Sequence, residues 1–171
     1  MAHKTSAWRF SNPVNLIFGV GSLSKLPELI SWDSVLLVTT PGATMRGTTQ
    51  RVQDLLGSRI STTYDKVGPE PQLAVLEDAG HLLRGYNYNG IVAVGGGSAI
   101  DTAKVLSYLL KIEGPQLRRH FEQFESLLPA DTLPVLAVPT TAGTGSEVTS
   151  FATVWDHDRR KKYSLATNSL H

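Results

Sequence analysis

The stretch IVAVGGGSAIDTAKVLSYLLK, residues 91–111, constrains the fold more than any other part of the chain. Its first residues, 91–94, form a short apolar run that is typical of a strand buried on both faces of a parallel sheet. Gly95, Gly96 and Gly97 follow, and because they lack a Cβ they permit a tight turn and the close approach of a ligand. A strand, a glycine turn and a helix in this order predict a phosphate site at the start of the helix.

Ser98 is expected to be the N-cap of the helix that follows the glycines. Asp101 stands three positions later, which is the spacing of a capping box, and apolar residues recur at helical intervals over residues 100–110. Asp101 is therefore interpreted as a cap rather than a catalytic acid, with Lys104 as its partner on the helix surface. The alternative is a tight connection without a ligand, since the G-x-G-x-x-G spacing of the common dinucleotide fingerprint is absent.

Buried strands alternate with helices along the chain, which predicts an α/β fold: a Rossmann-like, doubly wound, mostly parallel sheet with helices on both faces. Strands are expected at residues 34–39, 60–64, 91–94 and 133–138, and helices at residues 48–56 and 72–83 and after Ser98. Two later runs, residues 151–155 and 162–166, predict a C-terminal β-hairpin. The short apolar run 14–18 is interpreted as a strand that turns at Gly19 and Gly21 into a helix capped by Ser22, and residues 116–132 as irregular or short helix, polar and exposed.

Three segments are expected to meet at the carboxyl ends of the strands, where ligands of such sheets bind. They are Thr40, the turn at residues 95–98 and the loop at residues 139–146, PTTAGTGS. The hydroxyl groups of this loop suit a phosphate or a ribose, although the threonines could equally satisfy their own backbone. Thr40 stands where an acidic residue often binds the adenosine ribose, and an uncharged residue there leaves room for the 2′-phosphate of NADP.

Composition and spacing exclude several classes of function. Sixteen basic residues balance fifteen acidic ones, so neither nucleic acid nor a membrane surface is an expected partner. The chain has no cysteine, no apolar run of membrane-spanning length and no signal-peptide pattern, and a cytoplasmic location is expected. The length fits one domain. The five histidines lack the spacing of a metal site and no G-x-S-x-G elbow occurs, so no catalytic residue and no metal site are expected in this chain.

Four motifs resemble the N-terminal part of the iron-containing (group III, metal-dependent) alcohol dehydrogenases: FGVG at residues 18–21, GGGSAIDTAK at 95–104, PTTAGTGSEVT at 139–149 and RRKKYSL at 159–165. The resemblance implies that residues 1–171 are an NAD(P)-binding domain. It also implies that a helical domain absent from this chain holds Fe²⁺ or Zn²⁺ in the intact enzyme, which transfers hydride between the cofactor and a small alcohol or aldehyde. The isolated chain would then be inactive.

The same resemblance implies roles for individual residues. Gly96, Gly97 and Ser98 would hold the pyrophosphate, and Asp101 would bind or orient the glycine loop. Lys162 would reach the nicotinamide side. The cofactor cleft would be lined by Thr140, Thr141 and Thr144. Two positions depart from many relatives: Thr40 replaces an aspartate, which favours NADP or dual use, and Pro69-Glu70-Pro71 replaces a Pro-Asn-Pro loop.

Two other interpretations stay open at this point. One is a catalytically silent nucleotide-binding or assembly module. The other is a relative similar to dehydroquinate synthase or glycerol dehydrogenase, against which the motif at residues 139–149 argues. A homodimer through the edge strand or the hairpin is expected for the isolated domain, because the surface that would face the second domain is exposed.

Overall fold

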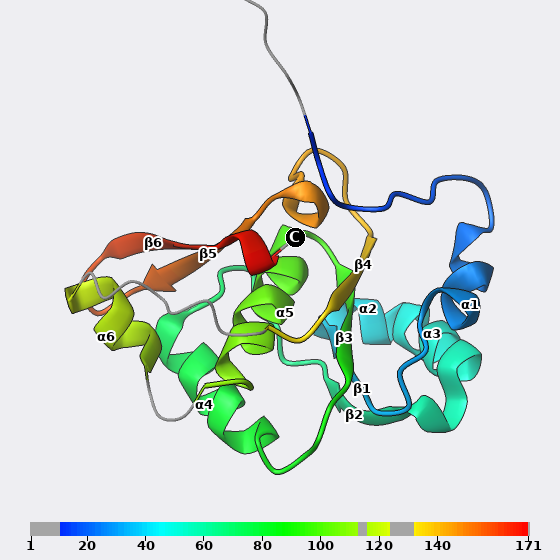
Figure 1. Ribbon diagram of the computed structural model, residues 1–171, viewed down its shortest axis with the longest axis horizontal. Coiled ribbons are helices and arrows are strands. Elements are labelled where there is room, and N and C mark those ends of the chain that lie inside the picture. Colours follow the sequence, from blue (N-terminus) through cyan, green and yellow to red (C-terminus); the bar gives the residue numbers. More distant parts are fainter. Residues whose placement is uncertain (1–10, 113–115, 124–131, 171) are drawn as a thin grey trace, which may run out of the picture.

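The structure, a computed structural model, describes residues 11–112, 116–123 and 132–170. Its centre is a four-stranded parallel sheet in the order β2-β1-β3-β4 (Figure 1). The strands are β1 (Val35–Thr39), β2 (Ile60–Tyr64), β3 (Gly90–Gly95) and β4 (Val135–Pro139). A separate antiparallel hairpin consists of β5 (Phe151–Asp156) and β6 (Lys161–Ala166). The predicted parallel α/β sheet with a C-terminal hairpin is confirmed.

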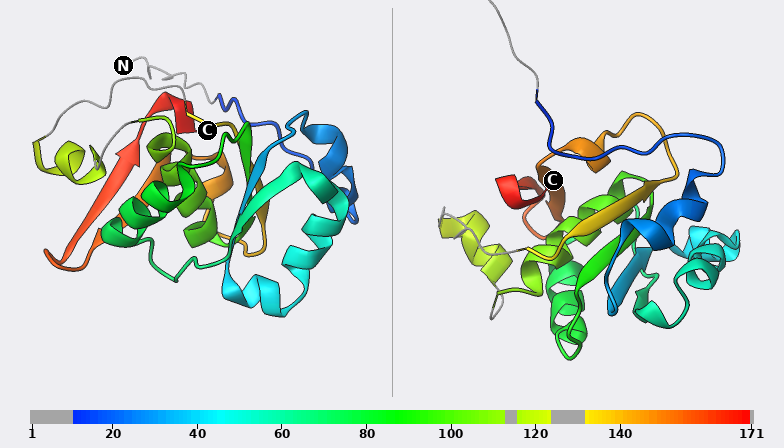
Figure 2. Two further views of the ribbon diagram at one scale, coloured as in Figure 1. Left: turned by 90° about the horizontal axis from the view of Figure 1, so that it is seen from below. Right: turned by 45° about the vertical axis from the view of Figure 1, so that its right-hand side comes forward.

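Helices cover both faces of the sheet (Figures 1 and 2). One face carries α1 (Leu26–Leu29) and α3 (Thr48–Leu56), with α2 (Pro41–Met45) beside α3, and the other carries α4 (Leu73–Leu83) and α5 (Gly97–Leu109). The remaining helical segments are α6 (Gln116–Gln123) and the short 3₁₀ turns η1 (Ser22–Lys25), η2 (Gly57–Arg59), η3 (Ser146–Val148) and η4 (Asn168–Leu170). Within the described residues, no helix has both the length and the apolar character needed to cross a membrane.

The apolar runs form buried strands because successive side chains point to opposite faces of the sheet. In β1, Leu36 and Val38 pack towards α4 and α5, whereas Val35 and Leu37 pack towards α1 and α3. The residues of β3 alternate in the same way. Both faces of these strands are therefore apolar, as a parallel sheet covered on both sides requires.

Helix α5 is a layer of its own between the sheet and the hairpin (Figure 1). All its residues from Ala99 to Leu109 are buried, because Ile100 and Leu106 pack on the sheet while Val105 and Leu109 pack against the hairpin cluster. The buried set includes both charged side chains of the helix. The prediction that Asp101 and Lys104 pair on the helix surface is therefore wrong.

Several predictions for the connecting segments need correction. Residues 14–18 form no strand, and Phe18 is fully exposed, because no described strand lies beside this segment to accept its backbone groups. The following turn η1 has Gly21 as its N-cap, at φ 77°, so Ser22 is not the cap. The short helix expected within residues 116–132 is present as α6, but its Leu117 is fully buried rather than exposed, and residues 124–131 lie outside the described part.

Substitution of Gly90 tests the packing at the start of β3. A Cβ at this position would lie 2.4 Å from two atoms of the rigid Trp32 ring, whereas a Cβ on Gly85 would meet nothing within 4 Å. We expect Gly90→Ala to lower the free energy of unfolding by about 1–3 kcal/mol, and Gly85→Ala to change it by less than about 0.5 kcal/mol. Urea denaturation followed by circular dichroism measures both. Equal losses in the two variants would contradict the packing described here.

Candidate functional site

The site lies where the sheet changes its winding direction. The connection from β1 to β2 passes over the face of the sheet that carries α3, and the connection from β2 to β3 passes over the face that carries α4. The neighbours at the switch point are therefore β1 and β3. Thr39 pairs with Val94 there, and a Cβ on Gly95 would lie 3.6 Å from Thr40 Cγ2. Ligands of doubly wound sheets bind at this point, outside the carboxyl ends of the strands.

Gly95 makes the turn out of β3 possible. Its φ is +155°, and a Cβ there would lie only 2.7 Å from the Cβ of Ala99, so both the backbone and the space require glycine. Gly96 is the N-cap of α5, without a side-chain cap, and Gly97 is the first helical residue. Ser98 is therefore not the predicted cap. Its hydroxyl donates to the carbonyl of Pro69 instead.

The threonine loop, residues 139–146, packs directly on the glycine turn. A Cβ on Gly96 would lie 2.9 Å from Thr141 Oγ1, and a Cβ on Gly97 would lie 3.1 Å from both Thr144 Cγ2 and Ser146 Oγ. The N–H of Thr140 donates to the carbonyl of Gly95 at 2.9 Å. The expected convergence of Thr40, the glycine turn and the threonine loop is thus present in the structure.

The convergence leaves a surface that solvent can reach. Gly96, Gly97 and Ser98 are partly exposed, and Thr140, Thr141 and Thr144 are exposed. The first N–H groups of the 13-residue helix α5 have no acceptor within the helix and lie at the positive end of its dipole. Bare backbone donors beside threonine hydroxyls suit an anionic group such as a phosphate.

Asp101 lies behind this surface and not at the glycine turn. Its Oδ2 accepts a hydrogen bond from the N–H of Thr153 on β5 at 3.0 Å, and the N-cap of α5 is Gly96, so the prediction that Asp101 caps the helix is wrong. Burial raises the pKa of Asp101. The hydrogen bonds from Thr153 and Ser146 and the charges of Lys104 and Lys162 act in the opposite direction.

Two sites of contact were not predicted from the sequence. Lys104 reaches the backbone of residues 149 and 151, and burial lowers its pKa while the charges of Asp101 and Glu147 act to raise it. No local pattern marked Lys104 as buried, because polar residues such as Asp101 and Ser107 lie near it on the same helix. Ser146 packs against Gly97, and the one sequence signal for this contact was the position of Ser146 in the hydroxyl-rich loop.

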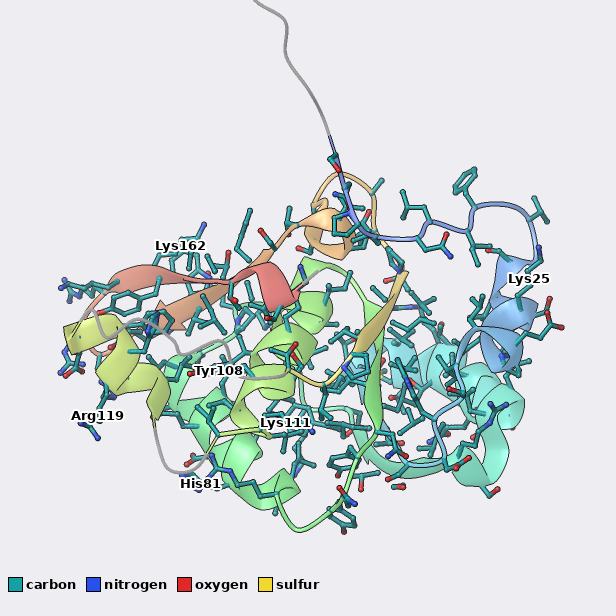
Figure 3. The ribbon with its side chains drawn as sticks, in the orientation of Figure 1. Lys25, His81, Tyr108, Lys111, Arg119 and Lys162 are labelled. Carbon is teal, nitrogen blue, oxygen red and sulfur yellow. The ribbon has the colours of Figure 1, made fainter. Side chains whose placement is uncertain are left out.

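Lys162 lies on β6, apart from the place where the glycine turn meets the threonine loop (Figure 3). Its Nζ is 5.3 Å from the centre of the Trp155 ring, within the range of a cation–π contact. The structure thus brings Thr40, the glycines and the threonines together and sets Lys162 on the hairpin.

The loop Pro69-Glu70-Pro71 is fastened to both α5 and the hairpin. The carbonyl of Pro69 accepts from Ser98, the carbonyl of Pro71 accepts from the N–H of Trp155 at 2.8 Å, and Glu70 Oε2 lies 3.0 Å from His157 Nε2. A cavity of about 130 Å³ beneath the loop extends to Thr102 on α5. The loop therefore forms a fixed border of the site on the side of β2.

Several known proteins are similar to this chain in sequence or in fold. The chain is 34% identical over 160 residues to choline dehydrogenase of Bacillus subtilis, covering 91% of this chain and 40% of that protein. It is 32% identical to alcohol dehydrogenase 4 of Saccharomyces cerevisiae, covering 97% of this chain and 44% of that protein. A solved structure of sulfoacetaldehyde reductase from Bifidobacterium kashiwanohense in complex with NAD⁺ superimposes with a TM-score of 0.85 at 27% identity, covering 96% of this chain and 44% of that one.

This chain therefore spans less than half the length of these relatives. The family model for iron-containing alcohol dehydrogenases matches residues 13–171, which include the glycine turn, the threonine loop and the hairpin. The motifs that carried the resemblance lie on the surfaces that meet at the switch point, apart from the hairpin motif and the weaker FGVG motif. The chain belongs to the iron-containing alcohol dehydrogenase family.

Proposed function

We propose that this chain, residues 1–171, is the nicotinamide-cofactor-binding domain of an alcohol dehydrogenase. The observation that carries the proposal is the contact between the bare glycine turn and the threonine loop at the β1/β3 switch point. A turn of three glycines without Cβ atoms, partly exposed to solvent and placed at the start of a long helix, fits a pyrophosphate. The NAD⁺ complex of the similar reductase supports this choice of ligand.

The residues of the site suggest how the cofactor is held. The N–H groups of Gly97 and Ser98 would bind the pyrophosphate, with the hydroxyls of Thr141 and Thr144 beside it. Thr40 would lie at the adenosine ribose, and Lys162 would serve the nicotinamide side. Once bound, the cofactor supplies or accepts a hydride. The protein groups described here bind and orient it.

The proposed reaction of the intact protein is the oxidation of a small alcohol or the reduction of an aldehyde, as the names of its relatives suggest. Such a reaction needs a group that polarises the substrate oxygen. Among the described residues, no three or more His, Asp or Glu side chains gather so that they could hold a metal ion. We therefore propose that Fe²⁺ or Zn²⁺ is bound by a helical domain outside this chain, and that this chain alone is inactive.

Thr40 and Arg46 favour NADP over NAD. The hydroxyl of Thr40 accepts from the N–H of Ala43 at 3.1 Å and so caps α2, which leaves the end of β1 without a carboxylate to bind the ribose hydroxyls. The exposed guanidinium of Arg46 folds back over this turn, with Nη1 3.1 Å from the position of a Cβ on Gly42. A guanidinium matches a phosphate in charge and geometry.

We also propose that the protein is a homodimer that forms through β4 or the hairpin. β4 is an edge strand whose residues 135–138 are only half buried, and unpaired edge strands tend to acquire a neighbour. Sedimentation velocity measures the mass in solution. A species with the mass of one chain at high concentration would contradict the proposal.

Cofactor binding by the chain is measurable without any turnover. We expect saturable enhancement of NADPH fluorescence, and Gly97→Ala to raise the Kd about tenfold because its new Cβ intrudes between Thr144 and Ser146. Gly85→Ala, in open space, is the matched control and should bind as the parent chain does. Absence of NADPH and NADH binding would favour a silent structural module.

The preference between the two cofactors tests the roles of Thr40 and Arg46. Arg46→Gln should weaken the binding of NADPH about tenfold, because a charge-assisted hydrogen bond is lost, and should leave the binding of NADH unchanged. Thr40→Asp should reverse the preference towards NADH, because a carboxylate binds the ribose hydroxyls and repels the 2′-phosphate. Arg51→Gln, an exposed arginine of the neighbouring helix α3, is the control. Equal losses of NADPH affinity in the Arg46→Gln and Arg51→Gln variants would exclude Arg46 from the site.

A further inference from the structure

Two oppositely charged side chains, Asp101 and Lys104, are buried on α5 one turn apart. They are 8% and 2% exposed. Removing charges from water costs free energy unless hydrogen bonds and a counter-charge compensate. The hydrogen bonds of these two side chains therefore show how the cost of burying their charges is offset.

Both side chains hold the backbone of the segment that leads into β5. The ammonium of Lys104 donates to the carbonyl of Thr149, and also lies 3.4 Å from the Thr149 hydroxyl and 3.4 Å from the carbonyl of Phe151. The carboxylate of Asp101 accepts from the N–H of Thr153 at 3.0 Å. One helix thus fastens residues 149, 151 and 153 with a donor and an acceptor of opposite charge.

The fastened segment, residues 149–153, follows the threonine loop directly after the turn η3. The near end of the loop is fixed by the hydrogen bond from Thr140 N–H to the Gly95 carbonyl, at the other side of the glycine turn. Between these two attachments, Thr144 and Ser146 lie against Gly97. The backbone on both sides of the threonine loop is therefore tied to a single strand–turn–helix unit, β3 and α5.

We propose that Lys104 and Asp101 are positioning residues, which set the separation of the threonine loop from the glycine turn by holding residues 149–153 against α5. This inference rests on the proposed cofactor-binding function. Neither side chain needs to touch the cofactor. Their effect passes through the backbone that carries Thr141 and Thr144.

The test combines amide hydrogen exchange with cofactor titration on the 171-residue chain. Lys104→Met keeps the length of the side chain and removes its charge and donors. We expect faster exchange across residues 140–153 and a Kd for NADPH raised about tenfold, because a loop that is no longer held in place has to be ordered when the cofactor binds. Lys104→Arg should restore much of both. Lys111→Met, an exposed lysine just beyond α5, is the matched control and should alter neither.

A second pair of variants keeps the test valid if Lys104→Met fails to fold. Asp101→Asn retains an acceptor for the Thr153 N–H, whereas Asp101→Ala does not. We expect faster exchange and weaker NADPH binding in Asp101→Ala than in Asp101→Asn, at temperatures well below unfolding. Faster exchange with unchanged affinity would overturn the proposal, because the two residues would then only stabilise the hairpin.

Failure of the proposed function gives a different pattern. If the unmodified chain binds neither NADPH nor NADH, the cofactor assignment falls. Exchange at residues 140–146 then decides the positioning role separately: acceleration in Lys104→Met would support it, and unchanged exchange in that variant would overturn it.

Discussion

The burial of α5 between the parallel sheet and the β5–β6 hairpin is the constraint on which the rest of the structure depends. Most helices of small proteins leave one face in water, but residues 99–109 of α5 are buried on every side. The helix cannot shift without disturbing two packed layers. The glycine turn at its start is therefore held in a fixed place at the carboxyl edge of the sheet, between β1 and the threonine loop.

This arrangement suits a protein that binds a flexible, highly charged ligand. A surface built in advance from backbone donors does not have to be ordered when the ligand arrives, so less binding energy is lost. The buried Asp101 and Lys104 extend the same principle inwards, because they fix the backbone behind the hydroxyl groups. The proposed division of labour follows: this domain orients the cofactor, and the metal that polarises the substrate belongs to another part of the protein.

Most elements could be predicted to within two residues because their signals are local. An apolar run marked β1, and Gly57 at φ 55° ended α3 where the sequence placed the stop. The prediction failed where an assignment depended on a neighbour distant in the chain. The apolar residues 14–18 found no described strand to pair with, and Ser98 gave its hydroxyl to Pro69 rather than to its own helix.

The sequence by itself determined the fold class, the order of strands and helices, and the three loops that converge at the switch point, since periodicity and glycine placement act over a few residues. Only the tertiary structure decided which residues lie on the exposed surface of the glycine turn and the threonine loop and which lie behind it. Asp101 and Lys104 are polar in the sequence but buried in the fold, because the hairpin, some fifty residues further along, covers the side of α5 that would otherwise face water. The environment of a side chain is a property of the packed layers, and no local pattern records it.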